Sequence, residues 1–232
     1  MSVRFLKLPT GPSDQELDAW FSPGRFAALL ALLILVMFPD VLLGGRTFIL
    51  RDFGLFGYPL AQYFRDSFWR GEIPLWNPLS NCGLPFLAQW NTLVLYPGSL
   101  FYLLLPLEWS LGVFNLLHLF LCGLGMYWLT WNWTGSRRAA TIAGLAFAFN
   151  GFTLNCLMWP NYIASLAWMP FVVLTVERAW RLGGRHLLTA ALAGAMQMLS
   201  GTPEIILITW LLLGAFWALQ LWQGEINRLA VV

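Results

Sequence analysis

Long apolar runs separated by short loops constrain this chain more than any other feature of its sequence. Hydrophobic residues make up 59% of the 232 residues and charged residues only 10%, whereas an average soluble domain has about 25% charged residues. A soluble fold needs charged side chains to cover its surface, and a chain in lipid does not. The 14 Trp and 18 Phe are typical of the membrane–water boundary, where aromatic rings accumulate. The sequence therefore predicts an all-α integral membrane protein.

The charge pattern argues against nucleic acid as a partner. The formal net charge is only +2, and the sequence has no basic run, zinc-ligand spacing or RNA-binding signature. The cysteines, Cys82, Cys122 and Cys156, form no CxxC pair and no metal-binding framework. The expected partner is the lipid bilayer.

The lengths of the apolar runs predict about six transmembrane helices, because a hydrocarbon core about 30 Å thick needs about 20 apolar residues per helix. The predicted spans are 24–43, 110–133, 139–157, 163–180, 186–200 and 204–222. A further apolar stretch, Leu93–Pro106, is short and is interrupted by Pro97 and Gly98. Whether this stretch crosses the bilayer depends on the topology.

The basic residues predict that topology, because Lys and Arg of short loops collect on the cytoplasmic side. They form an N-terminal group and three later clusters: Arg4, Lys7 and Arg25; Arg137 and Arg138; Arg178, Arg181 and Arg185; and Arg228. Two apolar runs separate neighbouring later clusters, so all of them can face the cytoplasm. The region 26–138 must then cross an even number of times, which the runs 24–43 and 110–133 already satisfy. Leu93–Pro106 is therefore expected to lie in the outer interface or to re-enter from outside.

This topology divides the chain into three parts. They are a cytoplasmic N-terminal tail (1–23), a transmembrane domain (24–222) with a large extracytoplasmic loop (44–109), and a cytoplasmic end (223–232). The first run has no good small-residue cleavage site and is expected to remain as a signal-anchor helix. The chain ends at Val232, shortly after an apolar helix, which is typical of a fragment of a longer protein.

Within the outer loop, Tyr58–Trp69 has the spacing of an amphipathic helix. Leu60, Phe64 and Phe68 share one face, which predicts an interfacial helix. The stretch 71–97 cannot be a single helix, because it contains several prolines: Pro74, Pro78, Pro85 and Pro97. It is expected to be an ordered loop rich in Trp, Asn and Pro, or to have no stable structure.

The pair Arg51 and Asp52 follows the first apolar run and is expected at the outer membrane surface. One interpretation is a local ion pair or a helix cap. The other is a catalytic carboxylate, which would deprotonate an acceptor hydroxyl or hold a divalent cation on a donor phosphate. The pattern alone leaves both open.

Glu204 also has two interpretations. Thr202, Pro203 and Glu204 at the start of an apolar helix are typical of a cap, a first turn and a side chain that complements the helix dipole. Alternatively, Glu204 is a second acidic group in the same outer cleft, and both interpretations can hold at once. His118 lies in the middle of the second predicted span, where a neutral histidine hydrogen-bonded to a neighbouring helix is commoner than a functional one.

The most specific pattern in the outer loop lies between residues 71 and 97. Its motif residues are Pro74, Trp76, Asn77, Pro78, Gly83 and Pro85. With Asp52 upstream and a Leu-Tyr-Pro string at residues 95–97, this pattern resembles the bacterial YfhO-like membrane protein family. The similarity covers about 52–204, and members of that family are usually much longer.

That family is similar to the GT-C class of glycosyltransferases. The resemblance therefore implies a GT-C-like fold and an enzyme that transfers a sugar from a polyprenyl-phosphate donor to an acceptor in the cell envelope. It also implies a bacterial cytoplasmic membrane, and the charges predict a cytoplasmic N terminus. The essential acidic residue of the first outer loop corresponds to Asp52. Residues 201–204 read Gly-Thr-Pro-Glu where family members often have Gly-His-Pro-Gln, so the His is missing and Glu204 replaces Gln.

The predicted site follows from the location of these residues at one membrane surface, where the phosphate of a membrane-bound donor must lie. Its catalytic carboxylates are Asp52 and Glu204, and its candidate phosphate ligands are Arg46, Arg51, Arg65 and Arg70. A divalent cation is the candidate cofactor, with Asp52 as its candidate ligand. A non-catalytic membrane transporter or lipid flippase, and a structural subunit, remain as alternatives; a transporter predicts polar residues and broken helices near the bilayer midplane.

Overall fold

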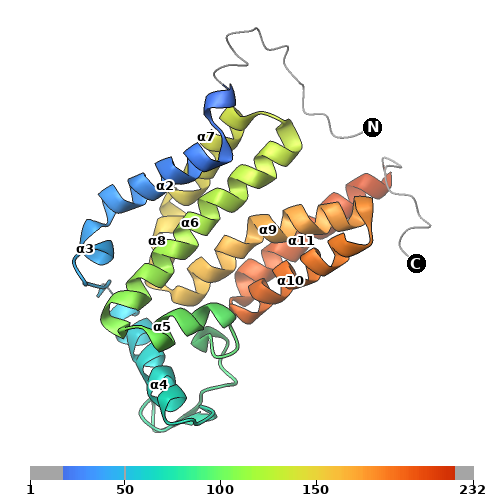
Figure 1. Cartoon of the computed structure of the whole chain (residues 1–232). Helices are drawn as coiled ribbons and strands as arrows, with labels where there is room; N and C mark the ends of the chain where they lie inside the picture. The colour runs from blue at the N-terminus through green and yellow to red at the C-terminus, as the bar shows by residue number, and fades with distance from the viewer. Residues whose placement is uncertain (1–17, 50, 223–232) are drawn as a thin grey trace.

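The computed structural model describes residues 18–49 and 51–222, which are predominantly helical. Long helices form an elongated bundle, and the segment between the first two of them folds against one end of it (Figure 1). The bundle helices are α2 (Pro23–Met37), α6 (Leu107–Thr134), α7 (Arg137–Ala148), α9 (Pro160–Leu182), α10 (Arg185–Leu199) and α11 (Pro203–Trp222).

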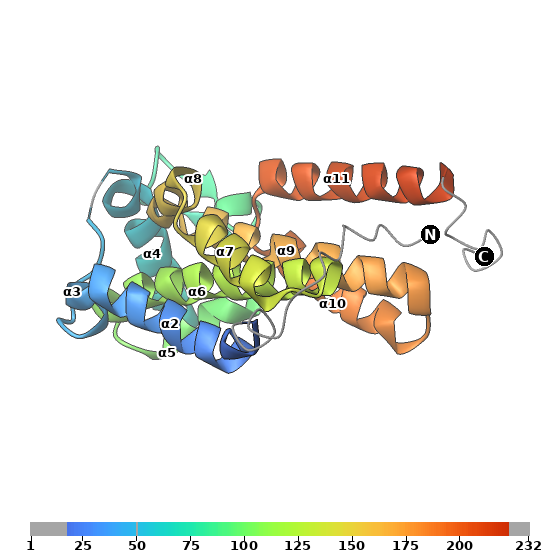
Figure 2. The same cartoon turned by 90° about the horizontal axis from the view of Figure 1, so that it is seen from above.

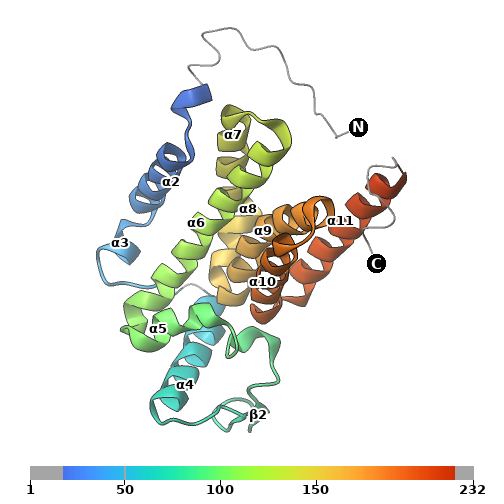
Figure 3. The ribbon, with the colours of Figure 1, turned by 45° about the vertical axis from the view of Figure 1, so that its right-hand side comes forward.

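The two ends of the bundle differ in chemistry. The loop end is formed by residues 43–49, 51–106, 149–160 and 200–204 (Figures 1 and 3). The arginine end carries Arg137, Arg138, Arg178, Arg181 and Arg185. Successive bundle helices alternate in direction. The basic clusters expected on one side thus lie at one end wherever the structure describes them, whereas Arg4, Lys7, Arg228 and the end 223–232 fall outside the described residues.

Three bundle helices, α6, α9 and α11, are long and apolar enough to cross a membrane. α7 continues into α8 (Gly151–Asn155) and η4 (Cys156–Met158) after a bend of 40°, and this pair is a fourth candidate if it is taken as one span. By length and composition, residues 18–49 and 51–222 thus contain three or four candidate spans, and the expectation of six spans stays a prediction. α2 and α10 have 15 residues each, which is about 22 Å of helix and less than the hydrocarbon core. The long apolar helices indicate a membrane-associated multi-pass protein.

Proline breaks the first predicted span. α2 starts with Ser22 as its cap, whose Oγ accepts a hydrogen bond from the Arg25 N–H, and with Pro23 in the first turn. It ends at Phe38 because Pro39 follows, and the residue before a proline is disfavoured in the helical conformation. A short helix, α3 (Pro39–Leu42), then leads into the outer loop.

α6 is the centre of one half of the bundle, with α2, α7 and α9 against it. α6 and α7 approach closely at Gly123 and Gly144, where a Cβ on Gly144 would lie 2.8 Å from the Gly123 carbonyl oxygen. Only small residues permit this approach. α9 is the centre of the other half and carries α10 and α11, with α11 packed along one side (Figure 2).

The segment between α3 and α6 forms a separate layer at the loop end. Its elements are η1 (Phe53–Gly57), α4 (Tyr58–Trp69), β1 (Trp76–Asn77), β2 (Leu84–Pro85), η2 (Trp90–Thr92), η3 (Pro97–Ser99) and α5 (Leu100–Leu104). α4 has the predicted bounds. The only regular helix within the stretch Leu93–Pro106 is α5, whose five residues are too few to cross a bilayer. Figure 3 shows α4 and the ribbon of β1 and β2 projecting away from the bundle.

Tyr96 fastens this layer to the bundle. Its hydroxyl oxygen lies 2.7 Å from His118 Nε2 in α6 and accepts a hydrogen bond of 2.8 Å from Trp168 Nε1 in α9. His118 Nδ1 lies 2.7 Å from the Phe114 carbonyl oxygen, which can only accept, so Nδ1 carries the proton and Nε2 accepts from Tyr96. His118 is therefore neutral and hydrogen-bonded, but its side-chain partner belongs to the outer loop rather than to a neighbouring helix. We refer to Tyr96, His118 and Trp168 as the Tyr96 clasp.

Candidate functional site

A cleft of about 700 Å³ opens at the loop end, where η2, the connection from α8 to α9 and the start of α11 meet. We call it the loop-end cleft. Its polar side chains include Gln89, Asn91, Asn155, Asn161, Tyr162 and Glu204. Trp90 and Trp159 add large aromatic surfaces. The cleft thus combines one carboxylate, several amides and two indole rings.

Gly201, just before α11, packs directly against the backbone of the outer loop at Trp90. Its φ is +72°, and a Cβ at this position would lie only 1.7 Å from the Trp90 carbonyl oxygen. Asn161 holds the same turn from the other side, because its Nδ2 donates to Thr202 Oγ1 at 3.2 Å and to the Gly201 carbonyl oxygen at 3.4 Å. The cleft wall is therefore built from segments about 40 and 110 residues apart in the chain.

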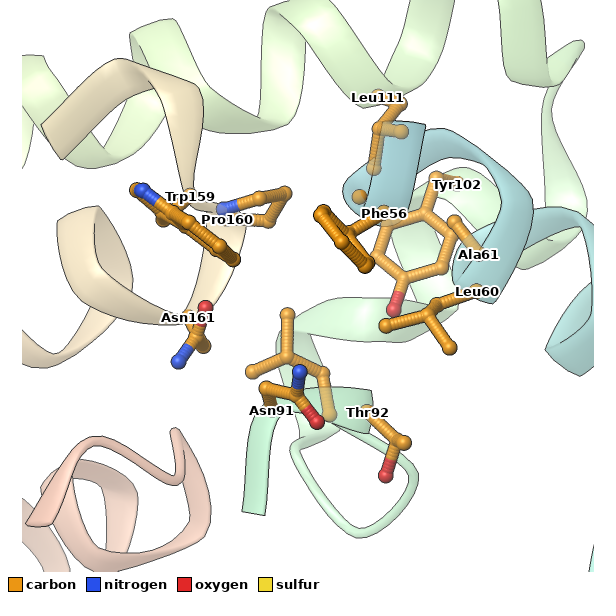
Figure 4. A pocket seen from close by; sticks show the side chains of 12 residues that line it. Phe56, Leu60, Ala61, Asn91, Thr92, Tyr102, Leu111, Trp159, Pro160 and Asn161 are labelled. Atoms are coloured by element: carbon orange, nitrogen blue, oxygen red, sulfur yellow. The ribbon is translucent and has the colours of Figure 1, made fainter. Parts of the chain in front are cut away.

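A narrow pocket of about 20 Å³ adjoins the cleft and shares Asn91, Trp159 and Asn161 with it. Figure 4 shows Asn91 and Asn161 on opposite sides of this pocket and Phe56 next to Trp159. The Phe56 and Trp159 rings are stacked with centroids 6.1 Å apart. The pocket has room for about one water molecule, and it joins η1 and α4 to the cleft.

Glu204 lines the loop-end cleft and also lies in the first turn of α11. The capping interpretation holds in part: Pro203 starts the helix and Glu204 complements its dipole. Thr202 is fully buried, and its hydroxyl accepts a hydrogen bond from Asn161. The cap and the cleft interpretations of Glu204 are therefore compatible in the structure.

Asp52 precedes η1 and is half-buried, but it is not among the residues that line the loop-end cleft. Within the described residues its carboxylate makes no hydrogen bond and no ion pair. The local pair with Arg51 is therefore absent, and Arg51 is exposed with a left-handed φ of 49°. η1 contacts η4 and reaches the cleft wall through Phe56. The structure thus does not bring Asp52 and Glu204 together in one cavity.

The arginines proposed for phosphate binding differ in their partners. Arg46 lies 3.7 Å from Asp40, and Arg70 lies 2.8 Å from Glu72, with all four side chains at least half exposed. Arg65 makes no ion pair with a described carboxylate, and its Nε is buried without a hydrogen-bond partner. Burial raises the pKa of the nearby Tyr58 hydroxyl, Glu108 raises it further, and Arg65 opposes both.

The loop motif builds a turn rather than the cleft. Trp76 pairs with Pro85 across β1 and β2, and a Cβ on Gly83 would lie 2.6 Å from the Trp76 ring, so only glycine fits beneath it. Asn77 is buried, accepts a hydrogen bond from the Leu79 N–H at 2.9 Å and donates to Ser80 at 3.2 Å. Pro74 is buried, whereas Pro78 is exposed. The predicted loop is therefore ordered.

Sequence reasoning missed Gln89 and Trp90 as parts of the site. Both follow the recognised motif and have no distinctive spacing, and only the contact of Trp90 with Gly201 shows their position. Asn155 and Asn161 also line the cleft.

The described residues contain no group of three or more His, Cys, Asp or Glu side chains that could hold a metal ion. A cation site at Asp52 thus gains no support from its surroundings. Comparisons with family models, with curated proteins and with solved structures found no match. The resemblance to the YfhO-like family remains a prediction.

Proposed function

We propose that this chain is a multi-pass membrane glycosyltransferase that takes a sugar from a polyprenyl-phosphate donor at the loop end. The observation that carries the proposal is the loop-end cleft, which combines Glu204 with amide side chains and the indole rings of Trp90 and Trp159. Amides exchange hydrogen bonds with sugar hydroxyls, and flat aromatic rings cover the apolar faces of sugar rings. A cleft of this composition suits a carbohydrate.

The proposed membrane placement puts the arginine end in the cytoplasm and the loop end outside. The positive-inside trend supports it, since the arginines of the two helix connections, Arg137 with Arg138 and Arg185, lie at the arginine end. A polyprenyl chain is confined to the bilayer, so its phosphate lies at the headgroup level. The loop-end cleft opens at the corresponding end of α9 and α11.

The proposed step is a displacement at the anomeric carbon of the donor sugar. The acceptor hydroxyl oxygen forms a bond to this carbon, and the bond from the carbon to the phosphate oxygen breaks, with both electrons leaving on the lipid phosphate. The acceptor proton passes to a carboxylate. Glu204 is the carboxylate that lines the cleft, so we assign it this role, and Asp52, which the family resemblance implies, is the alternative base.

Arg65 is the arginine that best fits the leaving phosphate. Arg46 and Arg70 already face carboxylates, whereas the buried Nε of Arg65 has no partner. A buried donor without a partner costs about 1–3 kcal/mol, and a phosphate oxygen would satisfy it. Arg65 lies one helical turn beyond Ala61, which lines the pocket next to the cleft.

The test is transfer of a labelled sugar from short-chain polyprenyl-phosphate donors by the protein in liposomes that contain cell-envelope acceptors. Glu204→Gln should lower the rate by about 10²–10⁴-fold, as expected for loss of a general base. Asp52→Asn is measured beside it, and Asp66→Asn is the matched control, because Asp66 is an exposed carboxylate on α4 outside the cleft.

Equal rates for the wild-type protein and Glu204→Gln, with loss only in Asp52→Asn, would move the base to Asp52. The transporter or flippase alternative predicts a different result in the same liposomes. Movement of a labelled lipid between leaflets, without sugar transfer from any donor, would replace the proposed enzyme activity.

A further inference from the structure

A second cavity, of about 510 Å³, lies on the opposite end of the bundle from the loop-end cleft. It is lined by Trp128, Trp131 and Asn132 of α6 and by Leu174 and Arg178 of α9. We call it the arginine-end groove. None of its residues lines the loop-end cleft, so the proposed transfer reaction does not account for it.

The part of the groove around Arg178 and Asn132 is cationic, and we call it the cationic head. The Nε and one terminal nitrogen of Arg178 both donate to Asn132 Oδ1, at 3.3 and 3.0 Å. A neutral amide orients the guanidinium without cancelling its charge, and three of its five N–H donors are left for another acceptor. The neighbouring Glu177 does not neutralise Arg178, because its carboxylate bonds to Trp133 Nε1 at 2.6 Å and to Arg181 at 2.8 Å.

A second cation borders the same head. The Arg137 guanidinium carbon lies 5.2 Å from the centroid of the Trp131 ring, and Trp131 lines the groove. Arg137 forms no ion pair with a carboxylate of the described residues. Asp18 accepts hydrogen bonds from Ser136 and from the Arg138 N–H, and its carboxylate lies 3.9 Å from Arg138 Nε. One guanidinium group thus contacts Asn132 and another contacts Trp131, and neither forms an ion pair with a carboxylate of the described residues.

The part of the groove formed by Trp128 and Leu174 is apolar. Trp128 lies one helical turn from Asn132 toward the middle of α6, and Leu174 lies one turn from Arg178 toward the middle of α9. The lining thus changes from cationic to apolar along the direction from the arginine end to the centre of the bundle. A phospholipid in one leaflet has the same order, with its phosphate at the surface and its acyl chains inside.

We propose that the arginine-end groove is a binding site for an anionic phospholipid of the leaflet at that end, with its phosphate on Arg178 and Arg137 and an acyl chain against Trp128 and Leu174. The inference rests on the proposed membrane placement and not on the sugar transfer. Its charge complementarity selects an anionic headgroup over a zwitterionic one, because the ammonium of a zwitterionic lipid would face the same two arginines.

The test is lipid retention by the purified protein in detergent, measured by native mass spectrometry with phosphatidylglycerol and phosphatidylcholine as probes. The wild-type protein should retain phosphatidylglycerol in preference to phosphatidylcholine. The double variant Arg137→Gln and Arg178→Gln should bind phosphatidylglycerol more weakly by about tenfold or more, as expected for lost hydrogen bonds to a charged group. Arg185→Gln is the matched control, because Arg185 is exposed at the same end but does not line the groove.

Two results would overturn the proposal. One is equal retention of phosphatidylglycerol by the double variant and the wild-type protein. The other is displacement of the lipid by millimolar glycerol phosphate, which would reassign the head to a soluble anion. An unchanged thermal transition of the double variant shows that it folds. Sugar transfer by the double variant separates the two proposals, since a failed lipid site leaves transfer intact.

Discussion

Removing the Tyr96 hydroxyl should destabilise the protein more than removing any exposed tyrosine hydroxyl. Tyr96→Phe keeps the ring but leaves His118 Nε2 without a donor and Trp168 Nε1 without an acceptor. His118 is 5% exposed and Trp168 is half-buried. A buried group that loses its partner costs about 1–3 kcal/mol, so these two together should cost about 2–4 kcal/mol. For a chain of this length that corresponds to a fall in Tm of about 5–15 °C.

The assay uses the protein's own thiols. Cys122 and Cys156 are free and buried, whereas Cys82 is free and exposed. On a Cys82→Ser background, a fluorogenic thiol reagent therefore reports the unfolding of the bundle during heating. Tyr63→Phe is the control, because the Tyr63 hydroxyl is also hydrogen-bonded, donating to the Trp76 carbonyl oxygen at 2.6 Å, but in an exposed position.

A double-mutant cycle decides whether the clasp acts as described. Tyr96→Phe and His118→Leu should be non-additive, since removing His118 eliminates one of the groups that Tyr96→Phe leaves unsatisfied. Additive losses, or a Tyr96→Phe transition within 2 °C of the Tyr63→Phe transition, would refute the clasp.

Three further predictions concern other contacts. Gly201→Ala should lower Tm severely, because its Cβ would collide with the Trp90 carbonyl oxygen, whereas Gly214→Ala has open space and should be neutral or stabilising; thermal scans of both variants check this. Glu177→Gln should cost about 1–2 kcal/mol by the same scans, because Glu177 is buried between Trp133 and Arg181, while Glu72→Gln at an exposed pair should leave Tm unchanged within error. Burial raises the pKa of Tyr96 to about 12. The stability that the neutral hydroxyl contributes is therefore complete below pH 10 and is lost as the pH rises toward 12. The fall in Tm between pH 9 and pH 11.5 should accordingly be smaller in Tyr96→Phe than in the wild-type protein.

Local sequence was enough to predict most of the helices. The bounds of α4 at Tyr58–Trp69 are those predicted from its spacing, and α6, α9 and α11 match apolar runs to within a few residues. Among the described residues, three or four helices are long and apolar enough to span, fewer than the six predicted runs, because α2 ends before Pro39 and α7 bends near Asn150. An apolar run measures only composition, and a single proline or capping residue divides it into shorter helices.

The candidate site depended much more on tertiary structure. Sequence identified Glu204, but it ranked Asp52 first, and Asp52 lies outside the loop-end cleft. It also could not show that Arg65, rather than Arg46 or Arg70, keeps a donor without a partner. Ion pairs at an exposed surface depend on which side chains happen to meet, and that is not encoded in local spacing.

The sequence by itself determined that the chain forms apolar helices whose short connections at one end carry arginines. Those properties follow from composition and from the helical period, which act over a few residues at a time. Only the tertiary structure decided that Trp90 would meet Gly201, that Tyr96 would reach His118, and that Asn132 would orient Arg178. These contacts join residues 22 to 111 positions apart. At the buried Tyr96–His118 contact, each polar group is left only the partners that packing brings within about 3 Å.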